Sequence, residues 1–330
     1  MEQVLPPPEK VEISLIIPVY NEEESLSRLF AAIEAVSPDI PPLEAIFIND
    51  GSTDSSLAIL KAQAEKDSRF KVISFVTNTG QTAAIQAGID FASGDILVFL
   101  DSDLQNDPAD IPKLLNKLAE GYDVVSGWRK DRKDNAIKRN LPSRIANSII
   151  SRVSGVHLHD YGCTLKAYRK NVIKPVRLYG EMHRFIPIYA KWQGAKVAEI
   201  PVTHHARQFG SSKYGLERIF KVILDILVVK FLSRYLTKPI YVFGGFGLLT
   251  FFISFCSLIW ALCLKWFAQT SLIQTPLPLF SGFCFLLGCI SILMGLLAEV
   301  VSRTYFESKR QDAYYIREMI NLKDPRHTPR

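Results

Sequence analysis

Charge is absent from two long stretches of this 330-residue chain. Residues 239–264 and 266–298 contain no Asp, Glu, Lys, Arg or His, and only Lys265 separates them. Each stretch is long enough to cross about 30 Å of hydrocarbon as a helix. The overall fractions, 48% hydrophobic and 22% charged, exclude a disordered or collagen-like protein. We therefore expect a folded domain joined to a transmembrane hairpin.

Cysteine is also scarce. The chain has five cysteines, four of them in the apolar stretches, and no C-x-x-C pair, which argues against a disulfide framework and a zinc site. The first ten residues lack the apolar core of a signal peptide. Basic residues flank the outer ends of the predicted hairpin, so the positive-inside rule predicts both termini and the folded domain in the cytoplasm, at the cell inner membrane. The formal net charge of +6 is too small to indicate nucleic-acid binding, and we expect none.

Short apolar runs alternate with helical patterns in the first half of the chain. The runs lie at 13–19, 45–48, 71–76, 96–100 and 123–126. They are rich in Ile, Val and Phe, which is typical of a buried, mostly parallel sheet. Helical patterns lie between them, at 25–36, after Ser52, at 80–92 and at 109–119. This alternation predicts an α/β fold whose ligands bind beyond the carboxyl ends of the strands.

We divide the chain into four parts. A cytoplasmic folded domain is expected at 1–214, a juxtamembrane amphipathic helix at 215–238, the hairpin at 239–302 with spans at about 239–264 and 276–300, and a cytoplasmic tail at 303–330. Four charged residues near the start of the amphipathic segment share one helical face, which indicates a helix in the membrane interface. A core helix packed on the sheet is the alternative.

Two carboxylates follow the apolar run that ends at Leu100. Asp101 and Asp103 point the same way in an extended segment, and Gln105 adds an amide oxygen. Such hard oxygen ligands suit Mg²⁺ or Mn²⁺. Because neither a Walker A loop nor a G-x-G-x-x-G motif occurs, a diphosphate would have to be held through the metal. A turn cap is the alternative interpretation of this D-x-D motif.

Polar residues also follow the first two apolar runs. Tyr20 could stack on a base and Asp50 could accept hydrogen bonds from it. Helix capping by Asn21, Asp50 and Ser52 is the alternative. Because these residues converge with the D-x-D motif at one sheet edge, a nucleotide pocket is the better interpretation.

Several blocks of sequence resemble a known family. PVYNEEESL, IFINDGSTDSS, NTGQTAAIQAGIDFASGD and FLDSDLQNDP are similar to blocks of the inverting family 2 glycosyltransferases with the GT-A fold. DYGCTLKAYRK, RQFGSSKYG and the hairpin narrow the resemblance to the polyprenyl-phosphate glycosyltransferases, relatives of dolichol-phosphate mannose synthase and the bacterial GtrB and ArnC enzymes. It covers essentially the whole chain. Many relatives have a basic residue after N-x-G, whereas this chain has Gln81, a feature closer to the users of UDP-sugars.

The resemblance implies metal-dependent, inverting transfer of a hexose from a nucleotide diphosphate sugar to polyprenyl (undecaprenyl) phosphate. UDP-glucose is the first candidate donor, with a UDP-aminoarabinose derivative or GDP-mannose behind it. Mg²⁺ or Mn²⁺ would be the cofactor. The resemblance assigns Asp103 and Gln105 to the metal and Asp101 to the metal or the nucleotide. It assigns four further residues to the nucleoside site: Pro18, Tyr20, Glu22 and Asp50.

The remaining residues that the resemblance assigns to the site are mostly basic and would contact the phosphates of the two substrates. The resemblance places contacts with the acceptor phosphate on Arg129, Arg139 and Ser143, and it gives Arg207 and Lys213 to a mobile loop that closes on the diphosphate. Solvated surface charges and attraction to anionic lipid headgroups are the alternatives for these cations. Asp160 is a candidate for orienting a sugar hydroxyl. His204 and His205 are expected to pack or cap rather than to bind metal.

Other functions compete with this one. Processive polysaccharide synthases carry a Q-x-x-R-W motif after the metal site, and this chain has no such motif. A transporter would need ionisable groups within its membrane spans, and the two predicted spans have none. A membrane-anchored nucleotide-sugar binding protein without catalysis remains the alternative from another class. The sequence does not decide between a monomer and a homo-oligomer.

Overall fold

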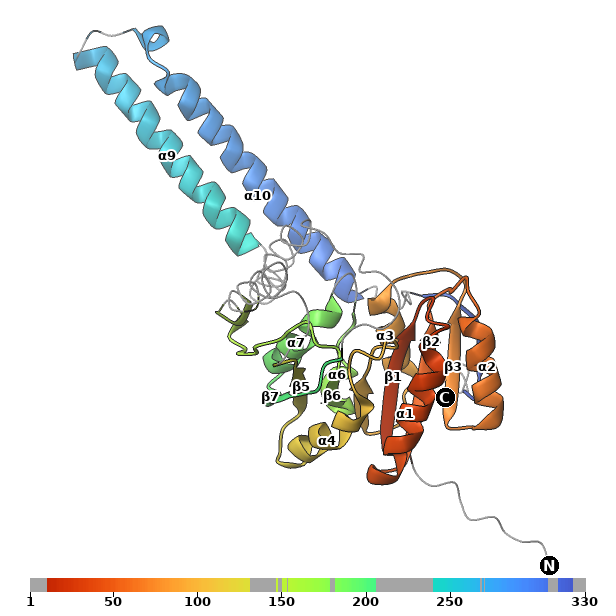
Figure 1. Cartoon of the computed structure of the whole chain (residues 1–330). Coiled ribbons are helices and arrows are strands. Elements are labelled where there is room, and N and C mark those ends of the chain that lie inside the picture. The colour runs from red at the N-terminus through yellow and green to blue at the C-terminus, as the bar shows by residue number, and fades with distance from the viewer. Residues whose placement is uncertain are drawn as a thin grey trace, which may run out of the picture. The chain divides into compact units, whose positions relative to one another are not determined.

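The computed structural model describes residues 11–130, 147, 150–152, 154–178, 182–205, 240–267, 269, 271–307 and 314–322. They belong to two compact units. The first unit comprises Met1–Val229 and Asp312–Arg330, and the second is Lys230–Gln311. Figure 1 shows a sheet in the first unit and a helical hairpin in the second. The amphipathic helix predicted at 215–238 lies outside the described residues.

An eight-stranded sheet organises the first unit, in the order β7-β5-β6-β4-β1-β2-β3-β8. Two strands run against their neighbours: β6 (Lys166–Arg169) is antiparallel to β4 and β5, and β8 (Ile316–Ile320) is antiparallel to β3. The remaining strands are β1 (Ile13–Val19), β2 (Leu43–Asn49), β3 (Phe70–Phe75), β4 (Ile96–Phe99), β5 (Val124–Trp128) and β7 (Val197–Pro201). The predicted mostly parallel α/β fold is confirmed.

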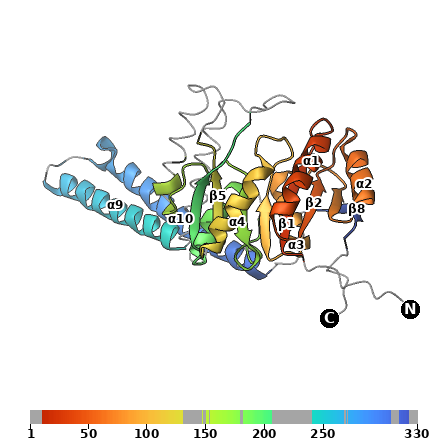
Figure 2. The same cartoon turned by 60° about the horizontal axis from the view of Figure 1, so that its bottom comes forward.

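Helices cover both faces of the sheet (Figure 2). In β1, Leu15 and Ile17 pack into one apolar cluster and Ile16 into the other, because successive side chains of a strand point to opposite faces. The cluster that contains Leu15 and Ile17 is completed by apolar side chains of three helices: α1 (Leu26–Val36), α2 (Ser56–Lys66) and α4 (Ile111–Ala119). The cluster that contains Ile16 is completed by side chains of α3 (Gln81–Phe91), α6 (Lys170–Ile173) and α7 (Ile186–Trp192). Burial on both faces explains why the central strands β1, β2 and β4 are largely apolar.

Within the described residues of this unit, three short 3₁₀ helices lie in the loops. They are η1 (Ser37–Asp39), η2 (Pro108–Asp110) and η4 (Met182–Phe185). The second of them leads from the D-x-D loop into α4. The last comes directly before α7 and contributes to the candidate site described below.

The chain returns to the sheet after the hairpin. β8 pairs with the edge strand β3, and Tyr314 stacks on Phe75 with ring centroids 5.2 Å apart. The Tyr314 hydroxyl also donates a hydrogen bond to Asp90 at 3.0 Å. Our sequence analysis describes 303–330 as a tail and anticipates no strand in it. Both ends of the hairpin therefore lead to one folded unit.

Two long helices form the second unit: α9 (Ile240–Phe267) and α10 (Leu277–Glu307), joined by η5 (Leu272–Gln274). The Ser254 hydroxyl donates to the Ser281 carbonyl at 2.8 Å, and the Ser281 hydroxyl donates to the Ser254 carbonyl at 2.9 Å. Small residues of this kind let membrane helices approach closely. Large apolar side chains such as Phe252 and Trp260 are exposed around the pair, which suits lipid better than water.

One buried carboxylate ties three parts of the first unit together. Glu44 accepts hydrogen bonds from the Ser14 hydroxyl at 2.5 Å, from the Ser93 backbone N–H at 2.6 Å and from the Lys71 ammonium. Burial alone would raise the pKa of the Glu44 carboxyl. The hydrogen bonds outweigh burial and lower that pKa below its ordinary value of 4.5.

We predict that Glu44→Gln destabilises the first unit by about 2 kcal/mol at pH 7, the size expected for hydrogen bonds to a charged group. Because the folded pKa is lowered, this contribution is complete above the unfolded pKa and is lost as the pH falls through the folded value. Thermal unfolding in detergent should therefore show a gap between the wild type and Glu44→Gln that shrinks below pH 4.5.

Glu318→Gln is the matched control, because Glu318 forms only a partly exposed ion pair with Lys61. Its effect should stay within about 0.5 kcal/mol. A gap for Glu44→Gln that persists unchanged at low pH would contradict the role given to the carboxylate.

Candidate active site

The carboxyl ends of β1, β2 and β4 meet at one edge of the sheet. Val19 pairs with Asn49 at the ends of β1 and β2, and Phe99 ends β4 beside Ile16 of β1. The residues that follow these three strands therefore lie together, at the edge where sheets of this type bind ligands. This edge gathers most of the site residues that the sequence nominates and that the structure describes.

The first two loops at this edge are cross-linked by hydrogen bonds. The Asn21 side-chain carbonyl accepts from Thr53 N at 2.8 Å, and Asn21 itself has a left-handed φ of 55°. Ser56 Oγ accepts from Glu22 N at 2.9 Å, while the Glu22 carboxylate accepts from the Ser25 hydroxyl at 2.9 Å. Tyr20 is 38% exposed on this loop, accessible to a base.

Asp50 fixes the third loop. It is only 4% exposed, and its two oxygens accept from Thr79 N at 2.6 Å and Gly80 N at 2.9 Å, just before α3 begins. Burial raises the pKa of this carboxyl, and the two backbone donors oppose that rise only in part. Gly51 has a φ of +66°, and a Cβ there would lie 2.6 Å from Asn78 N. Asp50 thus holds the loop at 77–80 and does not cap α2, the helix that follows it in the chain.

The D-x-D loop places two carboxylates close together. Asp101 accepts a hydrogen bond from Gln81 Nε2 at 2.9 Å and another from the Thr164 hydroxyl. Burial, with the charge of Asp103 nearby, raises the pKa of Asp101 to about 6. The Ser102 hydroxyl donates to the Pro18 carbonyl at 3.0 Å and anchors the loop to β1.

These residues fit a divalent cation. Gln105 donates to Asp103 from its backbone N at 3.1 Å and from Nε2 at 2.8 Å, so a turn of the amide would present its oxygen beside the carboxylate. A cation placed between two repelling carboxylates relieves the repulsion that raises the pKa of Asp101. Oxygen ligands of this kind suit Mg²⁺ and Mn²⁺ equally.

Arg129 and Asp160, which the sequence assigns to different tasks, form one buried ion pair. Arg129 Nε and Nη2 donate to the two Asp160 oxygens at 2.7 and 3.0 Å, and the side chains are 10% and 4% exposed. Burial lowers the pKa of Arg129, but Asp160 raises it more, so the net shift is upward. A Cβ on Gly162 would lie 3.1 Å from Arg129 Nη2, so the backbone passes close to the pair.

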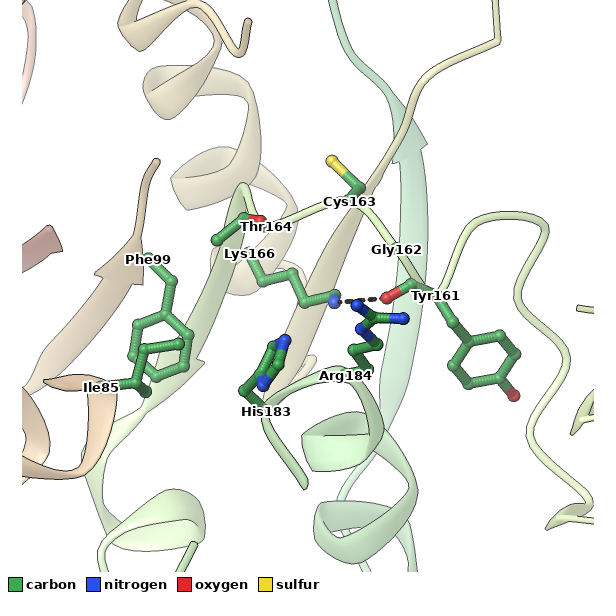
Figure 3. Close-up of a pocket in the computed structure, with 9 residues that line it drawn as sticks. All are labelled: Ile85, Phe99, Tyr161, Gly162, Cys163, Thr164, Lys166, His183 and Arg184. Atoms are coloured by element: carbon green, nitrogen blue, oxygen red, sulfur yellow. Dashed lines mark hydrogen bonds between the residues drawn. The ribbon is translucent and has the colours of Figure 1, made fainter. Parts of the chain in front are cut away.

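Sequence reasoning missed a group of polar residues around Lys166 (Figure 3). One of them, Thr164, bonds to Asp101. Lys166 pairs in register with Phe99, is buried, and donates from Nζ to the Tyr161 carbonyl at 3.0 Å. Burial lowers the pKa of Lys166 to about 8. His183 Nδ1 lies 2.7 Å from the Thr82 hydroxyl, and burial lowers the pKa of His183 to about 3. A lysine within the apolar strand of the DYGCTLKAYRK block is the one signal that could have found this group.

Four nominated residues, Arg139, Ser143, Arg207 and Lys213, lie outside the described residues. The segment that leads to Arg207 is anchored at the D-x-D loop. His205 N donates to the Gln105 carbonyl at 2.9 Å, and His205 Nε2 lies 3.0 Å from Asp107 Oδ2. His204 is buried opposite Asn106. Within the described ranges, no cluster of three or more His, Cys, Asp or Glu side chains is arranged to hold a metal.

Comparison with known proteins assigns the chain to a family. The family model described as "Glycosyl transferase family 2" matches residues 14–177. A dodecaprenyl-phosphate galacturonate synthase from Rhizobium johnstonii is 40% identical over 321 residues, which cover 96% of this chain and 95% of that protein. The chain belongs to the family 2 glycosyltransferases. An undecaprenyl-phosphate 4-deoxy-4-formamido-L-arabinose transferase from Shewanella sediminis is 36% identical over 312 residues, 93% of this chain and 92% of that protein.

Solved structures support the fold of this glycosyltransferase. A glucosyl-3-phosphoglycerate synthase from Mycobacterium tuberculosis, solved in complex with Mn²⁺ and UDP-glucose, aligns with a TM-score of 0.53. The alignment covers 68% of this chain and 79% of the other, at 18% identity. At that identity the likeness concerns the fold, and the GT-A architecture implied by the sequence resemblance is confirmed.

The raised pKa of Asp101 predicts how binding of a metal and nucleotide sugar depends on pH. A proton on Asp101 removes the charge that a cation needs, so affinity for Mn²⁺ with a UDP-sugar should fall about tenfold per pH unit below pH 6 and level off above pH 7. Titration calorimetry between pH 5 and 8 measures this. Affinity that stays constant across the range would contradict a protonated Asp101 in the metal-free enzyme.

The Arg129–Asp160 pair predicts a strong energetic coupling. Arg129→Met and Asp160→Leu should each destabilise the glycosyltransferase by about 3–5 kcal/mol, because each leaves one buried charge unpaired. The double variant should lose less than the sum of the two, by about 1–3 kcal/mol. Thermal unfolding of all four proteins in detergent completes the cycle, and additive losses would show that the two charges act independently.

Proposed function

We propose that this glycosyltransferase moves a sugar from a UDP-sugar to polyprenyl phosphate, with inversion at the anomeric carbon and with Mg²⁺ or Mn²⁺ as cofactor. One observation carries the proposal: Asp101 and Asp103 lie together at the carboxyl edge of β4, beside the loops that follow β1 and β2. Near full-length identity of 40% to a dodecaprenyl-phosphate galacturonate synthase supports the choice of acceptor.

The donor would bind across the loops at this edge. Pro18, Tyr20, Glu22 and Asp50 would line the nucleoside site, with the exposed Tyr20 ring stacking on uracil. Asp101, Asp103 and Gln105 would hold the cation. When bound, that cation would neutralise the charge that develops on the departing UDP.

The acceptor would bind next to the donor through cations of the protein. A lipid phosphate is already an oxyanion, so the reaction needs orientation and charge stabilisation more than a strong base. Arg129, with Arg139 and Ser143, would bind that phosphate, and Arg207 and Lys213 would close on the diphosphate. Asp160 accepts two hydrogen bonds from Arg129, and these orient the guanidinium group before substrate binds. A contact of Asp160 with a sugar hydroxyl is its second proposed role.

The hairpin would hold the enzyme at the inner membrane. Because β1–β7 and β8 belong to one sheet, both outer ends of the hairpin lead to the same folded unit, and they would lie on one side of the bilayer. Basic residues before and after the hairpin favour the cytoplasmic side. The amphipathic segment at 215–238 would lie in the interface, where a lipid phosphate is accessible.

The identity of the sugar is the finer part of the proposal. UDP-glucose is the first candidate donor. Gln81, the residue that favours a UDP-sugar, donates to Asp101 at 2.9 Å. The two relatives are named for galacturonate and for 4-deoxy-4-formamido-L-arabinose. All three sugars therefore belong in the test, with GDP-mannose as the donor carrying a different base.

A transfer assay tests the proposed function. Purified protein in detergent receives undecaprenyl phosphate, Mg²⁺ and one radiolabelled donor at a time. We predict that label enters the lipid phase from a UDP-sugar, and that EDTA or Asp103→Ala lowers the initial rate at least about 100-fold. Asp39→Ala, an exposed aspartate in η1, should keep the wild-type rate.

Two results would count against the proposal. Absence of lipid label from every donor, with UDP-sugar binding intact, would favour a nucleotide-sugar binding protein without catalysis. Full activity in EDTA would remove the metal from the reaction.

A further inference from the structure

A small cavity lies beside Asp101 and has no part in the mechanism proposed above. Its volume is about 20 Å³, room for one or two water-sized groups and too little for a sugar ring. Ile85 and Phe99 form an apolar wall, and Thr164, Lys166, His183 and Arg184 supply polar atoms (Figure 3). The cavity therefore suits a single small polar substituent of a larger ligand.

Lys166 is the unusual member of this cavity. Its side chain is 3% exposed, and its ammonium group donates one hydrogen bond, to the Tyr161 carbonyl at 3.0 Å. Within the described part of the chain, no carboxylate forms an ion pair with it. An ammonium group has three N–H donors, so two are unused. The charges of Asp160 and Asp101 act on this ammonium group without forming an ion pair with it. A buried cation with no anion in direct contact is costly, and an anionic ligand would lower that cost.

The other groups around the cavity keep its charge positive. Arg184 adds a second cation on the same wall. His183 stays neutral at physiological pH because burial and the nearby cations lower its pKa to about 3. Two acids outside the lining act on the Lys166 charge. Asp160 is paired with Arg129, and Asp101 accepts hydrogen bonds from Gln81 and Thr164. An entering group would therefore meet two cations and a neutral imidazole.

The cavity also lies where a substituent of the donor sugar would reach it. In the proposed complex, the diphosphate is at Asp101 and Asp103 and the acceptor phosphate is at Arg129, so the sugar lies between them. Gly162 and Thr164 occupy that interval: Gly162 is beside Arg129, and Thr164 bonds to Asp101. Both also line the cavity.

We infer that the cavity receives the carboxylate of a hexuronic acid donor, with Lys166 and Arg184 as its partners. This inference rests on the proposed function and specifies its substrate class. A carboxylate supplies oxygens for the unused donors of Lys166 and for the guanidinium of Arg184. The CH₂OH group of a neutral hexose would leave the buried cation without an anion in direct contact.

The test compares donors that differ only at C6. Titration calorimetry with Mn²⁺ measures binding of UDP-galacturonate, UDP-galactose and UDP to the full-length protein. The wild type should bind UDP-galacturonate at least about tenfold more tightly than UDP-galactose, because a site built for a polar group discriminates against its absence. Lys166→Met should reduce that preference to below about twofold and leave UDP binding unchanged. Lys174→Met, on an exposed lysine after α6, should keep the preference.

The other possible results of this experiment also support or overturn the inference. If Lys166→Met does not fold, Arg184→Gln replaces it and should reduce the preference at least about fivefold. Equal affinity of the wild type for the two donors would overturn the inference, while lipid labelling from a neutral donor would leave the proposed function standing. An equal loss of UDP affinity in Lys166→Met would assign Lys166 to the diphosphate and overturn it as well. Failure of the wild type to bind UDP would overturn the proposed function itself.

Discussion

The two neighbouring carboxylates of Asp101 and Asp103 repel each other, so contacts from the surrounding loops must hold them in place. Asp101 is buried next to Asp103, and its pKa rises to about 6 as a result. Such a pair is unfavourable without a cation, so the surrounding structure must hold it in place. Gln81 and Thr164 bond to Asp101, Gln105 bonds to Asp103, and Ser102 anchors the loop to β1. These contacts come from four separate segments of the chain.

The loops around the carboxylates are fixed to one another rather than to the core alone. Asp50 holds the backbone before α3, and α3 in turn presents Gln81 to Asp101. Asn21 and Thr53 link the loops after β1 and β2. A change at Asp50 would therefore act on the D-x-D loop through α3, without any direct contact. Catalytic groups held this way keep their geometry before substrate binds, which is what electrostatic catalysis requires.

Features of the fold and site that depend on residues close together in the chain could be predicted from sequence, and those that depend on distant contacts could not. The strands and the D-x-D edge follow from apolar runs and from the residues directly after them, both local in the chain. The pairing of Arg129 with Asp160 depends on contact across 31 residues, and that of β8 with β3 on a return of the chain after the hairpin. Lys166 went unnoticed because one lysine in an apolar strand indicates an edge or a bulge as readily as a buried cation.

The distribution of charge suits an enzyme that brings two anionic substrates together. A set of free cations would repel itself in the absence of substrate, yet the most buried arginine of the described site is already paired with Asp160. The carboxylates of Asp101 and Asp103 balance the cations on the other side of Gly162. Within the described residues, the site thus holds carboxylates and cations next to one another before either substrate binds. Lys166 differs from Arg129, because within the described residues its ammonium group forms no direct ion pair and feels Asp160 and Asp101 only at longer range. An anion in direct contact with Lys166 would therefore stabilise the fold.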